Sequence, residues 1–79
     1  MHWTLNVELT HKDWLQPIHK TLYFEGDLDR VLAKIKEDMQ GKTRDSDLWN
    51  LKHNRSTSFR DINNVTHRWR LQEDGPTAA

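Results

Sequence analysis

The sequence predicts a single small α+β domain, with the order strand, strand, helix, strand, short helical turn, strand, and one helix packed on the sheet. Three observations lead to this prediction: residues 3–10 alternate between apolar and polar, residues 28–39 carry one helical apolar stripe, and 79 residues suit one domain. We expect the domain to span residues 1–72 and residues 73–79 to form a disordered tail.

The first half of the chain predicts a hairpin followed by a helix. Trp3–Thr10 places apolar side chains at every second position, and Ile18–Glu25 repeats this pattern with an interruption at Lys20. Asp27 suits a helix N-cap, because its carboxylate can accept a free backbone N–H of the first turn. Gly41 is placed to end the helix in a left-handed conformation. The apolar stripe of the helix consists of Leu28, Val31, Leu32, Ile35 and Met39.

The second half predicts two further strands. Leu48–Leu51 reads as a short strand with Trp49 and Leu51 facing inward, after a polar connector at Lys42–Asp47. Val65–Leu71 alternates clearly between apolar and polar and predicts the last strand.

The segment Thr57–Asn64 leaves two interpretations open. A two-residue hairpin turn at Asn63-Asn64 would place Phe59 on the sheet face opposite Trp69. Because Phe59 and Ile62 are three residues apart, the pattern favours one short helical turn instead.

The layout resembles the ubiquitin-like β-grasp superfold. Asp27–Ile35 resembles the capped helix of ubiquitin, Ser58–Ile62 resembles the short turn before its last strand, and Val65–Leu71 is similar to that strand. The resemblance implies an open sheet that can bind partners, although fold alone says little about function. Residues 75–79 contain no Gly-Gly pair, so the resemblance implies no conjugation.

The residue types needed for most catalytic sites are absent or badly spaced. The chain has no Cys and only three Gly, and none of its five His shows zinc-ligand spacing. His11 and Asp13 share one loop and form either an acid–base pair or two solvated side chains. His67 is expected at the core edge, bonded to backbone. We therefore predict no enzyme, no catalytic residue, no metal and no cofactor.

Trp14-Leu15 is the most informative departure from the expected pattern, because both residues interrupt a polar loop that ends at Pro17. Trp14 either folds back over one end of the core or forms an exposed anchor for a partner. The second interpretation predicts a non-enzymatic protein–protein interaction module. Such a module would be an adaptor, an inhibitor or a small subunit of a larger assembly, including the assemblies that mobile elements encode. Its predicted partner-binding residues are Trp14, Leu15, Tyr23, Arg68 and Arg70.

The alternative prediction is a nucleic-acid-binding protein that uses the basic C-terminal half. Residues 42–72 hold seven Lys or Arg against three Asp or Glu, although the net charge of the chain is zero. The alternative site consists of Lys52, Arg55, Arg60, Arg68 and Arg70. These side chains also suit an ordinary solvated face. No signal peptide pattern or long apolar run is visible, so we expect a cytoplasmic protein without a membrane partner.

Overall fold

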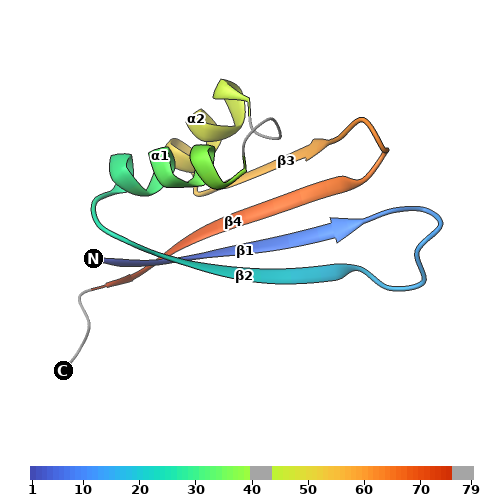
Figure 1. Ribbon diagram of the computed structural model, residues 1–79, viewed down its shortest axis with the longest axis horizontal. Helices are drawn as coiled ribbons and strands as arrows, with labels where there is room; N and C mark the ends of the chain where they lie inside the picture. The colour runs from blue at the N-terminus through green and yellow to red at the C-terminus, as the bar shows by residue number, and fades with distance from the viewer. Residues whose placement is uncertain (40–43, 76–79) are drawn as a thin grey trace.

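Four strands form one antiparallel sheet in the order β2-β1-β4-β3, and two helices lie between β2 and β3 in the sequence (Figure 1). The computed structural model describes residues 1–39 and 44–75. The predicted small α+β class is confirmed. The elements are β1 (His2–Thr10), β2 (Ile18–Glu25), α1 (Leu28–Asp38), α2 (Asp45–Asn54), β3 (Ser56–Arg60) and β4 (Thr66–Gly75).

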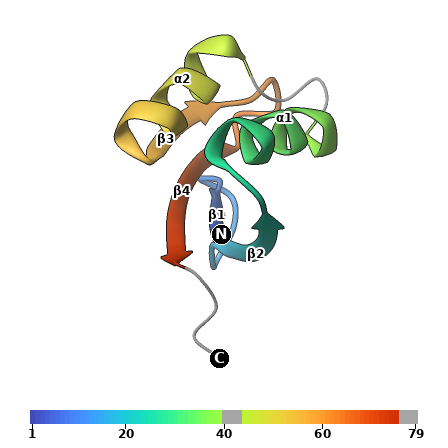
Figure 2. The same ribbon diagram turned by 90° about the vertical axis from the view of Figure 1, so that its left-hand side faces the viewer.

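One face of the sheet is buried beneath the helices, and the other face is open. Burial alternates along β1 as the sequence predicts, and both helices lie on the same side of the sheet (Figure 2). The core is aliphatic and aromatic, which gives α1 and α2 a continuous apolar surface to pack on. Its buried members are Trp3, Leu5, Val7, Val31, Leu32, Ile35, Leu51, Phe59, Trp69 and Leu71.

The α1 helix begins as the sequence predicts. The backbone N–H of Arg30 donates to the Asp27 carboxylate at 2.8 Å, which satisfies a free donor of the first turn. The helix ends at Asp38, and the N–H of Met39 donates to the carbonyl of Ile35. The predicted helix end at Gly41 lies outside the described residues.

The predicted strand at Leu48–Leu51 is wrong, because these residues lie in α2. Leu48 and Leu51 are three residues apart, so a helix places both on one side, where Leu51 is fully buried and Leu48 packs against the core. Asp47, which we assigned to a polar connector, accepts the backbone N–H of Arg44 and closes the first helical turn. Trp49 points outward rather than inward.

The predicted helical turn near residues 58–62 is also wrong, because residues 56–60 form β3. A connection over residues 61–65 replaces the two-residue turn and pairs Phe59 with His67. This shift of one residue moves Phe59 onto the buried face, where its ring packs edge-on against the Trp69 ring with 5.2 Å between the two ring centroids. The ubiquitin-like turn expected at Ser58–Ile62 is therefore replaced by a strand and the start of a loop.

The last strand is longer than the alternation predicts. β4 continues to Gly75, three residues beyond the expected domain end at residue 72, and pairs Glu73 with Trp3 of β1. Residues 76–79 of the expected tail lie outside the described residues. In Figure 1 the loops at residues 11–17 and 61–65 project from the same end of the sheet, beyond the helices.

Candidate partner-binding surfaces

The loop between β1 and β2 holds Trp14 and Leu15 away from the core. Trp14 is 37% exposed and Leu15 is fully exposed, and neither belongs to the core cluster of the described residues. The N–H of Trp14 donates to the carbonyl of His11 at 3.0 Å, and its ring lies 5.7 Å from the His11 ring. The loop therefore presents both side chains to solvent, and Trp14 packs on its own loop.

His11 and Asp13 contact each other within the loop. The backbone N–H of Asp13 donates to His11 Nδ1 at 3.0 Å. The Asp13 carboxylate lies 3.7 Å from the same nitrogen and is mostly exposed. The pair stabilises the loop conformation that displays Trp14.

Tyr23 lies too far from Trp14 to extend the loop surface. It pairs with Thr4 near the far end of β2 and is 77% exposed on the open face of the sheet. Ile18 begins β2 next to the loop, and five residues of strand span about 17 Å. Tyr23 therefore belongs to the sheet face rather than to the loop.

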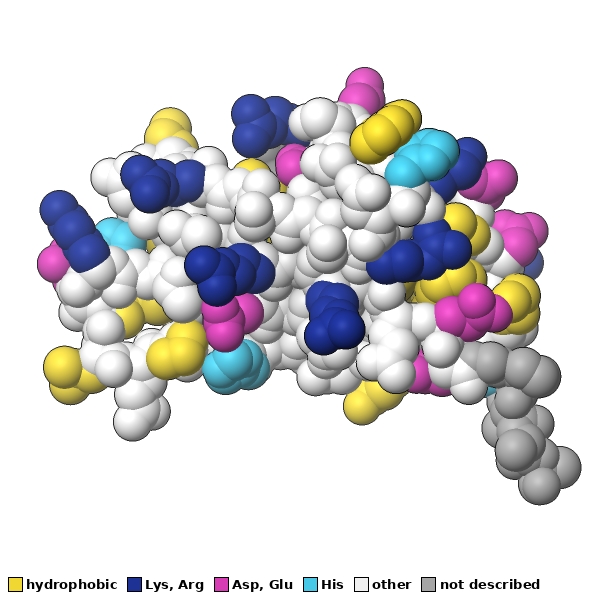
Figure 3. Space-filling view, turned by 180° about the vertical axis from the view of Figure 1, so that it is seen from behind, with side chains coloured by type: hydrophobic (Ala, Val, Ile, Leu, Met, Phe, Trp, Pro, Cys, Tyr) yellow, Lys and Arg dark blue, Asp and Glu magenta, His cyan; other side chains and the backbone are white. Residues whose placement is uncertain are grey.

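The strand pairing gathers three arginines on the open face, one in each of three successive cross-strand rows. Arg60 of β3 pairs with Thr66, and the next row contains Ser58, Arg68 and Glu8. The third row contains Ser56, Arg70, Asn6 and Thr21. Figure 3 views this face, where the dark blue Lys and Arg side chains follow one another along the sheet.

Glu8 is the one carboxylate in these three rows, and it contacts charged or ionisable groups on both sides. Its Oε1 lies 3.9 Å from Arg68 Nη1, and its Oε2 lies 4.0 Å from His19 Nε2. Among the described residues no carboxylate lies within 4.0 Å of the Arg70 guanidinium. These three rows of the open face therefore keep an excess of positive charge.

Lys52 and Arg55 do not join the arginines of the open face. Lys52 lies on α2, and its Nζ is 3.3 Å from the carboxylate of Asp29 on α1. Arg55 ends α2 in a left-handed conformation with φ of 61°, and its guanidinium lies 5.4 Å from the Trp3 ring centroid. The Arg55 carbonyl accepts the N–H of Leu71 at 2.7 Å. Two of the five predicted nucleic-acid contacts thus help to join structural elements.

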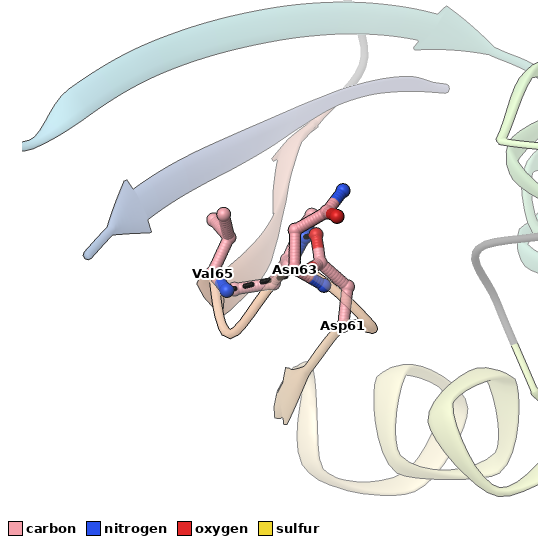
Figure 4. Close-up of polar contacts among 4 residues, drawn as sticks. Asp61, Asn63 and Val65 are labelled. Atoms are coloured by element: carbon pink, nitrogen blue, oxygen red, sulfur yellow. Dashed lines mark hydrogen bonds and ion pairs between the residues drawn. The ribbon is translucent and has the colours of Figure 1, made fainter.

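The turn between β3 and β4 contains a polar cluster that the sequence did not reveal. The Asp61 carboxylate accepts the backbone N–H groups of Asn63 and Val65 at 2.8 and 3.1 Å (Figure 4). It also lies 2.9 Å from Nε2 of the buried His67, which stacks on Phe59. This bond replaces the backbone partner predicted for His67. The hydrogen bond from His67 holds the pKa of the Asp61 carboxyl below its ordinary value of 3.8.

A second exposed tryptophan lies on α2. Trp49 is 58% exposed, and its ring centroid is 4.4 Å from that of His53, one helical turn further along. Sequence reasoning missed this pair because it assigned Trp49 to the buried side of a strand. The i, i+4 spacing would have identified it once the segment was read as a helix.

The comparisons with known proteins give no relative. No family model, no curated protein and no solved structure matches the chain. The ubiquitin-like β-grasp resemblance thus stays a prediction. Neither helix in the described part of the chain has the length and apolar character needed to cross a bilayer. Within residues 1–39 and 44–75, no three His, Asp or Glu side chains are grouped so that they could hold a metal ion.

Proposed function

We propose that this chain is a non-enzymatic protein-interaction module that docks through the loop between β1 and β2. The observation that carries the proposal is the exposure of Trp14 and Leu15 at the end of the sheet away from both helices. An exposed tryptophan is costly to leave in water, and tryptophan is among the residues that contribute most to interfaces. An adaptor, an inhibitor or a small subunit of an assembly would each use such an anchor.

The local structure of the loop supports docking with little ordering cost. The N–H groups of Asp13 and Trp14 both donate to His11, and Pro17 restricts the backbone where the loop enters β2. A loop ordered before binding loses less conformational entropy when the partner arrives. Leu15 stands beside this turn as a fully exposed apolar side chain that a partner can cover.

The test compares Trp14→Ala with the wild-type chain in a melting experiment and in affinity capture from the source cell lysate. We expect an unchanged melting temperature, because the ring lies outside the core, and loss of the captured protein. Trp49→Ala is the matched control, since it removes an exposed tryptophan from α2 and should keep capture. Clear destabilisation by Trp14→Ala, or capture that survives it, would contradict the proposal.

A further inference from the structure

We infer that the open face of the sheet binds single-stranded nucleic acid along a stripe of four basic side chains. This goes beyond the proposed function, because it concerns the open sheet face and Lys12 rather than Trp14 and Leu15, and a different class of partner. The basic stripe consists of Lys12, Arg60, Arg68 and Arg70.

The basic stripe follows the strand direction. Arg60, Arg68 and Arg70 occupy successive rows, and rows on one face of a strand are about 7 Å apart. Lys12 extends the series beyond Arg60, since both line one shallow pocket of about 460 Å³ with Thr10, Asn64 and Thr66. A second pocket of about 410 Å³ includes Arg68, Arg70, Asn6 and the Glu8 carboxylate in its wall. Basic side chains therefore line two neighbouring hollows on one face.

The neighbours of the basic stripe are hydroxyl and amide groups, which suit a phosphate backbone. The rows contain Thr10, Thr66, Ser58, Ser56 and Asn6, all of which can donate to phosphate oxygens. Beside them, a third hollow is lined by Asn50 and Asn54 of α2 together with residues of β3 and Arg68. An acidic protein surface would need fewer such donors at the centre of its interface, where apolar contacts dominate.

The shape of the face and its aromatic residue favour a single strand over a duplex. A duplex is read by an element that enters a groove, whereas a broad sheet face presents no such projection. Tyr23 lies on the same open face, two strands from Arg70, at an estimated Cα separation of about 12 Å. A basic track beside an exposed ring is the pattern by which proteins bind single strands, with one base stacked on the aromatic side chain. The basic stripe ends near Tyr23, where the carboxylate of Asp74, which is hydrogen-bonded to Thr4, would repel a phosphate group.

The test is fluorescence anisotropy with labelled dT15 and rU15 oligonucleotides, measured between 50 and 200 mM salt. Four phosphate contacts predict a slope of log affinity against log salt of about −2.8, which is about 50-fold weaker binding across this range. The double variant Arg68→Ala/Arg70→Ala should reduce the slope to about −1.4 and weaken binding at 50 mM by about tenfold or more. Glu8→Gln should strengthen binding by about 1.5- to 5-fold, because it removes the carboxylate that faces Arg68.

The control variant Lys34→Ala/Lys36→Ala removes two exposed positive charges from α1 and should leave affinity nearly unchanged. An equal loss in this control would refute the site and indicate a general charge effect. Equal affinity for a 15-base-pair duplex would overturn the assignment to single strands. Equal affinity for a polyglutamate peptide, with the same dependence on Arg68 and Arg70, would overturn the assignment to nucleic acid.

Discussion

Shortening Ile35 to alanine tests the packing that holds α1 on the sheet. Ile35 is fully buried, and it is one of three buried side chains through which α1 contributes to the core. Removing most of a buried aliphatic side chain costs about 2–5 kcal/mol through lost transfer energy and the cavity that remains. A 79-residue domain has about 4–12 kcal/mol of total stability, so Ile35→Ala should remove a large part of it.

The assay is thermal and urea unfolding followed by far-UV circular dichroism. A loss of about 3.5 kcal/mol, the middle of the expected range, corresponds to a melting temperature lower by about 15–30 °C for a domain of this size. Ile35→Val should cost only about 0.5–1.5 kcal/mol, and Lys34→Ala, on the exposed side of α1, should change little. If Ile35→Ala melted within about 2 °C of the wild type, the assignment of this helix face to the core would be wrong.

Two further predictions concern carboxylates that the structure places in hydrogen-bonded positions. The pKa of Asp61 is lowered in the folded state, so its contribution to stability is present above pH 3.8 and is lost as the pH falls through the folded pKa. The urea midpoint of the wild type should therefore decline between pH 6 and pH 2, and that of Asp61→Asn should decline less. Asp47 is buried and accepts a hydrogen bond from the hydroxyl of Thr57 at 3.0 Å. Asp47→Ala leaves that hydroxyl unpaired and should lower the free energy of unfolding in urea by about 1–3 kcal/mol. A loss below about 0.5 kcal/mol would contradict this role.

The elements predicted correctly from the sequence are those in which a regular apolar pattern within one segment is enough to specify the buried face. The alternation of Trp3–Thr10 and the stripe from Leu28 to Ile35 each specify a buried face without reference to the rest of the chain. The cap at Asp27 follows from local chemistry alone. These parts of the structure agree with the pattern because local preference and tertiary packing favour the same conformation.

The second half was misread because its conformation depends on contacts between distant residues. Asp47 joins α2 to Thr57 of β3, and this buried hydrogen bond gives no local signal. The β3 register depends on a longer turn, which Asp61 stabilises through the N–H groups of Asn63 and Val65. Reading α2 as a strand then hid the exposure of Trp49.

The candidate residues could be named from the sequence, but which of them lie together on one surface could be predicted only in part. Of the two positions left open for Trp14, the structure shows the one outside the core, beside the exposed Leu15, whereas Tyr23 lies on the sheet face. Arg68 and Arg70 share one face because they are two residues apart in a strand, which alternation predicts. Arg60 joins them only through the pairing of β3 with β4, which periodicity within one segment cannot specify.

The central position of β1 and β4 has a consequence for synthesis on the ribosome. All of β2 is translated before β4, whereas the second neighbour of β1 is β4, so Leu5 can pair with Leu71 only after residue 71 has been translated. Until then the nascent hairpin has an unpaired edge beside an apolar face formed in part by Trp3 and Val7. Pairing across so long a stretch of chain is slow, and exposed edges of this kind promote aggregation. The yield of folded protein should therefore depend on the rate of translation and on chaperones that bind the β1–β2 hairpin until β4 has been translated.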